Sequence, residues 1–263
     1  MLIGNPRGGY SFLKGIAPYS AGAVAADGFE IVHARFRRPV PLARGFERAK
    51  EHLASVQRPL QALCAMELRS PTPFTFQGFN DFNAGYIGVL KSWDVFLDGA
   101  NPVARTNVAP EIGAPAEPSL YAFSYTLPVA PAAGALPKTF IVAGGGELPE
   151  GSLDPHDVVR RGEVSVEALR EKTRFVMGLM TGRLKGLGVT WDLATVTGIY
   201  TVHSIDEFVA SEVVKPMSGG GAHGMLWHYS RPPIVSIEYE MDVRGCRREL
   251  VLENRPLDTT GLQ

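Results

Sequence analysis

The chain runs twice through the same order of sequence patterns, and this duplication restricts its fold more than its composition does. Proline, alanine and glycine dominate residues 126–138 (TLPVAPAAGALPK), close to the middle of the 263 residues, as is typical of a linker. On each side the order is strand, helix, strand, helix, isolated arginine and final strand. We predict two tandem α+β units, residues 1–130 and 131–263, each with a mixed or antiparallel sheet backed by two helices.

The expected elements of the two units rest on hydrophobic periodicity. In the first unit they are a strand at 27–36, a helix at 43–57, a strand at 60–70, a helix at 81–97 and a strand at 119–127. In the second unit they are a strand at 138–148, a helix at 165–188, a strand at 192–204, a helical stretch at 206–217 and a hairpin at 234–253. Residues 60–70 also fit a buried helix. Ser165 is the expected N-cap of the long helix, and Gly186 or Gly188 is expected to end it.

Charge and composition exclude several classes of partner. The net charge is −1 and the pI is near 6.6, so no basic surplus is available for nucleic acid or anionic membranes. The chain contains no 18-residue apolar run, and its N-terminus lacks the apolar segment of a signal peptide. Cys64 and Cys246 are too few for a disulfide framework and lack metal-ligand spacing. We expect a cytoplasmic protein with free thiols.

Six short motifs occur in an order that matches one known family. They are APYSAG (17–22), FNDFNAGYIGVL (79–90), NPVARTNV (101–108), FIVAGGGELPEG (140–151), IYTVHSIDEF (199–208) and SRPPIV (230–235). Together they resemble the RidA/YjgF family of enamine and imine deaminases. The resemblance touches both halves and most of the chain.

The resemblance implies a fold, a reaction and an assembly. Units of this family are small, chorismate-mutase-like α+β folds that associate in threes, with ligand pockets in the clefts between neighbours. The reaction hydrolyses an enamine or imine to a ketone and ammonia without a metal or organic cofactor. The resemblance therefore implies a hydrolase with a small carboxylate substrate and a homotrimer.

Arg105 and Arg231 are the two candidate carboxylate clamps. A guanidinium offers two parallel N–H donors and keeps its charge, which suits a carboxylate. Each arginine stands at the matching place of its half, in NPVARTNV and SRPPIV, where the family's signature arginine holds the carboxylate of a 2-imino acid. The alternative for either residue is a surface arginine or a structural ion pair.

The residues expected to accompany the clamp are divided between the halves. By resemblance, the first half supplies Tyr19 and Asn107 as substrate contacts, with Tyr19 also a candidate catalytic group. The second half supplies Gly144, whose bare backbone can approach a ligand, and Glu249 as the carboxylate that orients a water. A register shift would replace Glu249 by Glu253. This division suggests a composite site, although divergence into a different pocket would leave the same pattern.

His33 and the chain's length guide the choice of substrate. His33 takes the place of a family serine or threonine, and it either binds a second carboxylate or is an ordinary strand histidine. Two arginines with His33 and Arg35 could satisfy two carboxylates, so we favour a 2-aminomuconate-type amino-dicarboxylate from aromatic degradation. Two alternatives stay open at this point: a chorismatase-like hydrolase of an enol ether, and a non-catalytic protein that binds ligands or regulates.

Overall fold

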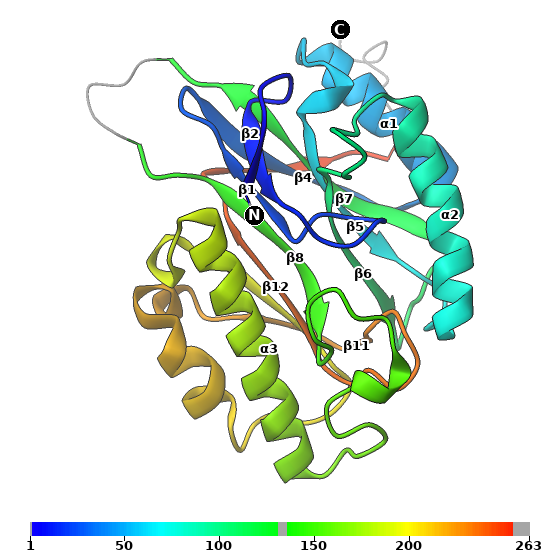
Figure 1. Ribbon diagram of the computed structural model, residues 1–263, viewed down its shortest axis with the longest axis vertical. Helices are drawn as coiled ribbons and strands as arrows, with labels where there is room; N and C mark the ends of the chain where they lie inside the picture. The colour runs from blue at the N-terminus through cyan, green and yellow to red at the C-terminus, as the bar shows by residue number, and fades with distance from the viewer. Residues whose placement is uncertain (1, 131–135, 255–263) are drawn as a thin grey trace, which may run out of the picture.

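The computed structural model describes residues 2–130 and 136–254 (Figure 1). Two mixed β-sheets pack against each other in the middle of the molecule, where β6 of one contacts β8 of the other. Figure 1 shows helices α1 and α2 on one side of the paired sheets and α3 on the other. The predicted α+β class is confirmed. No helix within 2–130 or 136–254 has the length and apolar character needed to cross a membrane.

Within the described residues, the two sheets contain seven and six strands. In order, the seven-stranded sheet consists of β1 (Leu2–Asn5), β2 (Tyr10–Leu13), β3 (Gly22–Ala25), β8 (Phe140–Gly146), β12 (Glu240–Gly245), β9 (Val196–Tyr200) and β10 (Leu226–His228). In order, the six-stranded sheet consists of β11 (Ser230–Arg231), β6 (Ala104–Pro110), β5 (Leu63–Arg69), β7 (Ser119–Pro128), β4 (Phe29–Pro41) and β13 (Arg248–Leu252). Residues 63–69 are therefore a strand, which decides between the two interpretations of that segment.

Each sheet contains strands from both halves of the chain. The first three strands, from the N-terminal half, extend the second half's sheet through the antiparallel pair β3–β8. In return, β13 leaves the second half and pairs in parallel with β4. The prediction of a hairpin at 234–253 is therefore wrong. Its first arm, β12, pairs with β8 and β9, and its second arm crosses to the other sheet.

Helices α1 (Leu42–Ser55) and α2 (Phe76–Ser92) cover the six-stranded sheet. In α1 the buried residues recur at helical spacing: Gly45, Phe46, Ala49 and Leu53. Helix α2 begins five residues before the predicted 81, because the Thr75 hydroxyl accepts a hydrogen bond from the Gly78 N–H at 3.0 Å and caps the helix there.

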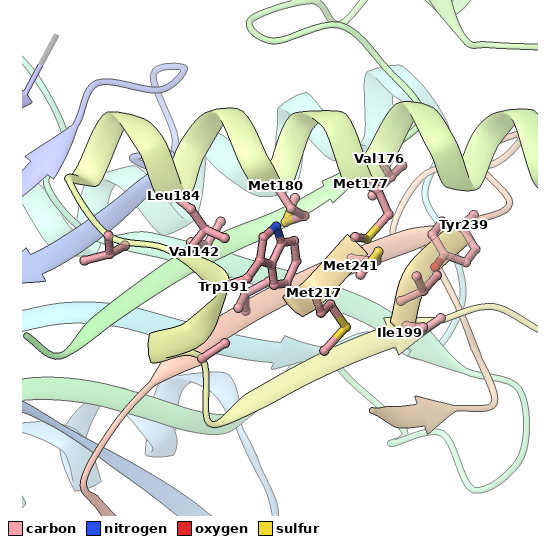
Figure 2. Packing of buried hydrophobic residues seen from close by; sticks show 14 of the residues in the cluster. Val142, Val176, Met177, Met180, Leu184, Trp191, Ile199, Met217, Tyr239 and Met241 are labelled. Atoms are coloured by element: carbon pink, nitrogen blue, oxygen red, sulfur yellow. The ribbon is translucent and has the colours of Figure 1, made fainter. Parts of the chain in front are cut away.

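Helix α3 (Val166–Leu187) lies along the outer face of the seven-stranded sheet. As predicted, Ser165 caps its N-terminus, accepting from the Ala168 N–H at 3.2 Å, and Gly188 ends it in the left-handed conformation at φ 71°. Figure 2 shows the core beneath it, formed by the labelled residues Val142, Val176, Met177, Met180, Leu184, Trp191, Ile199, Met217, Tyr239 and Met241. The predicted helical stretch at 206–217 is a π-helical turn (Ala210–Val214) followed by a 3-10 segment (Lys215–His223).

Candidate active site

A pocket lies between the sheets, where β6 of the six-stranded sheet meets β8 and β12 of the seven-stranded sheet. Its volume is about 640 Å³, counted with its open mouth, within the size range of small-molecule sites. Four residues predicted from the sequence line it together: Tyr19, Arg105, Asn107 and Gly144. The first three come from the N-terminal half and Gly144 from the C-terminal half, so both halves contribute to the wall.

The guanidinium of Arg105 is buried in an aromatic box. Arg105 is 3% exposed, and its Cζ lies 4.7 Å from the centre of the Tyr19 ring and 4.8 Å from that of Tyr86. Phe79 and Phe82 complete the box at 5.3 and 5.8 Å. Neither Nη1 nor Nη2 has a hydrogen-bond partner among the described residues. A buried cation without a counter-ion is costly, so this geometry suits an anionic ligand.

Asn107 adds a third unpaired donor group to the same wall, after the two Nη groups of Arg105. Its Oδ1 accepts a hydrogen bond from the Ser70 hydroxyl at 3.0 Å, which fixes the orientation of the amide. Its Nδ2 is buried and has no partner within the described chain. A ligand oxygen bound by Arg105 could therefore meet an amide donor from the same strand.

Glu240 on β12 is a buried carboxyl group that lines this pocket. It is 4% exposed. Burial, together with the neighbouring Asp242, holds the pKa of Glu240 well above the usual range of a glutamate, although Arg183 and Arg105 oppose the shift. Such a shift favours the protonated form of the carboxyl group, which can donate a proton.

The glycine at 144 leaves the space that Glu240 occupies. A Cβ on Gly144 would collide with Glu240 Oε1 and would lie 3.1 Å from Thr106 Cα. The N–H of Gly144 donates to the Thr106 hydroxyl at 3.0 Å. The close approach of β8 to β6 and β12 therefore depends on a residue without a side chain.

A second arginine, Arg183 of α3, reaches the pocket from the other wall. Its Nε and Nη2 donate to the two carboxylate oxygens of Glu150 at 2.9 and 3.1 Å, and its Nη1 donates to the Ala143 carbonyl at 2.8 Å. Glu150 is 45% exposed at its side chain, whereas Arg183 is 8% exposed. The Arg183 cation thus holds a partner that water can reach.

Three predicted residues lie outside this pocket. Arg231 donates to both carboxylate oxygens of Glu111 at the surface, at 2.7 and 3.2 Å. Glu249 is on β13, which crosses to the other sheet, and it accepts from Arg244 at 2.9 Å. His33 lines a separate cavity with Glu249. The alternative acid, Glu253, binds Arg37 at the surface.

Sequence reasoning missed Glu240 because it treated β13, not β12, as the last strand of the second unit. A signal was present. In residues 237–241 (IEYEM) two glutamates alternate with apolar residues, and Tyr239 and Met241 are buried in the α3 core. Because strand side chains alternate between faces, Glu240 points to the opposite face, toward the other sheet.

Comparison with known proteins places the chain in a family. The family model described as 2-aminomuconate deaminase CnbZ matches residues 2–250. The chain belongs to this family. A curated relative, 2-amino-5-chloromuconate deaminase from Comamonas testosteroni, is 47% identical over 246 residues, which are 93% of this chain and 96% of that protein. The prediction of a 2-aminomuconate-type deaminase is confirmed, and the chain is a deaminase that hydrolyses a C–N bond.

Two solved structures are similar at low sequence identity. A chorismatase is 11% identical with a TM-score of 0.47, covering 86% of this chain and 77% of that chain. A candidate endoribonuclease from Thermotoga maritima is 16% identical with a TM-score of 0.30, covering 42% of this chain and 80% of that chain. The assignment to the deaminase family rests on the sequence matches rather than on these two structures.

Proposed function

We propose that the chain deaminates a 2-aminomuconate-type dicarboxylate in the pocket of Arg105, by hydrolysis and without a cofactor. The observation that carries this proposal is the buried guanidinium of Arg105 with two unpaired Nη groups. The bidentate fit of a carboxylate to a guanidinium would satisfy both groups at once. Tyr19 and Phe79 of the aromatic box line the pocket and offer flat faces to a conjugated chain.

The two arginines of the pocket match the two carboxylates of such a substrate. Arg105 would hold the carboxylate beside the amino-bearing carbon, since it lies on the same wall as Tyr19 and Asn107. Arg183 is the second cation in the wall, and it would receive the distal carboxylate by exchange with the exposed Glu150. Arg35 and His33, which the sequence offered for this role, line another cavity.

Glu240 would act first as an acid. Its raised pKa supports a protonated carboxyl group near neutral pH. Proton transfer from Glu240 to a carbon of the dienamine converts the C=C–NH₂ unit into an iminium ion and leaves Glu240 as a carboxylate. The same carboxylate then accepts a proton from a water molecule as that water attacks the iminium carbon.

The carbinolamine formed in this way breaks down to the products. A proton passes from its hydroxyl group to its nitrogen while the C–N bond breaks, which releases ammonia and leaves the keto acid. Tyr19 lies against Arg105, and burial raises the pKa of its phenol, so its hydroxyl stays protonated and can relay this proton. Substrate and water together balance the products, and Glu240 ends in its starting form.

The named relative supports the dicarboxylate class. Its name, 2-amino-5-chloromuconate deaminase, gives a 2-aminomuconate with chlorine at position 5 as its substrate. The chlorinated and unchlorinated compounds share the two carboxylates and the enamine that the proposed contacts address. We propose the unchlorinated or the 5-chlorinated compound for this chain.

The test is ammonia release from freshly generated 2-aminomuconate by the wild type, Arg105→Met and Glu240→Gln. We expect kcat/KM to fall on the order of 100-fold or more for each variant, as is usual for a lost charge-assisted contact or a lost acid. Arg231→Met is the matched control, because Arg231 has the same charge but is paired with Glu111 at the surface. It should stay within about twofold of the wild type, as surface ion pairs are weak.

Two results would contradict the assignment. Loss of activity in Arg231→Met with little change in Arg105→Met would place the clamp on the other arginine. Loss of activity in Glu249→Gln with little change in Glu240→Gln would restore the acid expected from the sequence. The predicted three-fold association stays a prediction, and light scattering of the purified protein would test it.

A further inference from the structure

A second polar cavity lies between the sheets, separate from the pocket of Arg105. Its volume is about 570 Å³, counted with its open mouth. Its lining includes Arg35, Tyr121, Tyr200, His228 and Arg244. Leu226 stands at its mouth and is 51% exposed.

Two arginines, Arg35 and Arg244, and two glutamates, Glu67 and Glu249, line this cavity. Arg244 donates to Glu249 at 2.9 Å, and its Nη1 lies 3.9 Å from Glu67 Oε1. Arg69, which is 4% exposed, lies 3.9 Å from Glu67 Oε2. The two glutamates thus already face Arg244 and Arg69. Arg35 makes no ion pair within residues 2–130 and 136–254, and its Cζ lies 5.9 Å from the Tyr121 ring centre.

The two histidines of the lining add hydrogen-bonding groups without charge. Burial and the nearby Arg244 lower the pKa of His33 to about 3, and burial and Arg69 lower that of His228 to about 4. Both rings are therefore neutral near pH 7. The Nδ1 of His33 lies 3.2 Å from the Ser124 hydroxyl, which orients the ring.

Flat side chains form much of the wall. The rings of Tyr200 and His228 stack with their centres 4.8 Å apart at an angle of 13°. The Tyr121 ring also lines the cavity, and the guanidinium of Arg69, which is not part of the lining, lies 3.9 Å from its centre. Such surfaces suit a planar, conjugated ligand.

A row of hydrogen bonds stands between the two cavities. The Thr106 hydroxyl, which accepts from Gly144 in the first pocket, donates to Asp242 Oδ2 at 2.8 Å. The Tyr200 hydroxyl donates to the same oxygen at 3.0 Å from the second cavity. These buried side chains separate the two cavities, so each cavity can hold its own ligand.

We propose that this second cavity is an accessory binding site for a planar, conjugated carboxylate, held by Arg35 and stacked against its aromatic wall. One unpaired arginine suits one carboxylate group. The site would therefore accept conjugated monocarboxylates as well as dicarboxylates, whereas the first pocket, with two arginines, favours dicarboxylates.

The test is calorimetric titration with two unreactive probes, trans,trans-muconate (a dicarboxylate) and sorbate (the monocarboxylate with the same diene). We expect two muconate sites per wild-type chain, one in Arg105→Met and none in the double variant with Arg35→Met. Sorbate should bind the Arg105→Met protein through the remaining site. Arg38→Met is the matched control, because Arg38 is on the same strand but exposed, and it should keep both sites.

Charge changes at the mouth provide a second measurement that does not depend on Arg35. In the Arg105→Met background, Leu226→Lys should tighten and Leu226→Glu should weaken sorbate binding, by about tenfold between the two. The proposal is overturned if Arg105→Met removes all binding, or if the remaining site is indifferent to both Arg35→Met and the charge at position 226. Retention of two sites in Arg105→Met would instead count against the proposed clamp and leave the Arg35 test intact.

Discussion

Arg105 and Arg183 enter the same pocket in different electrostatic states. Arg105 has no anionic partner among the described residues, whereas Arg183 shares its charge with Glu150. Glu150 is exposed and sits on the segment that lines the mouth, with Pro149 and Gly151 on either side. Glu150 therefore occupies the donors of Arg183 as a ligand carboxylate would, and it can be displaced. Competition between Glu150 and the distal carboxylate would set the preference for dicarboxylates.

Replacing Glu150 by Gln is expected to favour the dicarboxylate substrate. The neutral amide competes less for Arg183, so KM for 2-aminomuconate should fall about two- to fivefold, the range of a partly exposed ion pair. KM for the monocarboxylate 2-iminopropionate should not change. Steady-state kinetics with both substrates give the ratio. Glu117→Gln, the same change at an exposed position outside the pocket, is the control, and an equal shift for both substrates would contradict the exchange.

The glycine at 144 permits a more local prediction. In Gly144→Ala the added methyl group would meet the Glu240 carboxyl group and the backbone of Thr106. Displacing the acid by about 1 Å should lower kcat/KM on the order of 100-fold. Gly178→Ala is the matched control: Gly178 is an exposed α3 residue with open space around its Cα, and the change should stabilise the helix by about 1 kcal/mol. Unchanged activity in Gly144→Ala would contradict the role of Glu240 as the catalytic acid.

At the scale of elements, a buried ion pair ties the pocket segment to α3 and β12. Lys172 of α3 donates to Glu147 at 2.9 Å and to the Val159 carbonyl at 2.9 Å. Glu147 also accepts the backbone N–H groups of Glu238 and Tyr239, at 2.7 and 3.0 Å. Both charged side chains are fully buried. One carboxylate thus joins the ends of β8 and β12 to a helix, beside the pocket.

Breaking this ion pair should destabilise the protein strongly. In Lys172→Met, Glu147 stays buried without its cation, and we expect the free energy of unfolding to fall by about 3–5 kcal/mol. Chemical denaturation measures this value. The double variant with Glu147→Met removes the stranded charge and should recover part of the loss. The account is contradicted if the double variant loses more free energy of unfolding than the two single variants lose together.

Elements differ in how far local sequence determines them. The ends of α3 follow from Ser165 and Gly188, whose effects act within one helical turn, so they were predicted correctly. The partners of β12 and β13 depend on strands about 100 to 220 residues away, such as β8 and β4, and local alternation carries no such information. The same limit explains the site: Arg105 and Gly144 stand in local motifs, whereas choosing Glu240 over Glu249 required the strand pairing.

For the whole molecule, the exchange of strands makes each half depend on the other. The sheet of the second half is extended by β1–β3, and the sheet of the first half by β11 and β13. The boundary between residues 130 and 131 stays a prediction about repeated units. Because both sheets cross that boundary, we expect the intact chain to unfold in one cooperative step.

Separating the halves tests this dependence. Residues 1–130 alone would lack β13, one of the two strands that pair with β4, and residues 131–263 alone would lack β3, one of the two strands that pair with β8. We expect neither half to show a cooperative unfolding transition by circular dichroism. The control is the full chain with a protease site inserted at the boundary and cut after folding. Its halves stay paired through both sheets, so it should keep deaminase activity. A cooperative transition in either isolated half would mean that the exchanged strands are additions to a unit that folds independently.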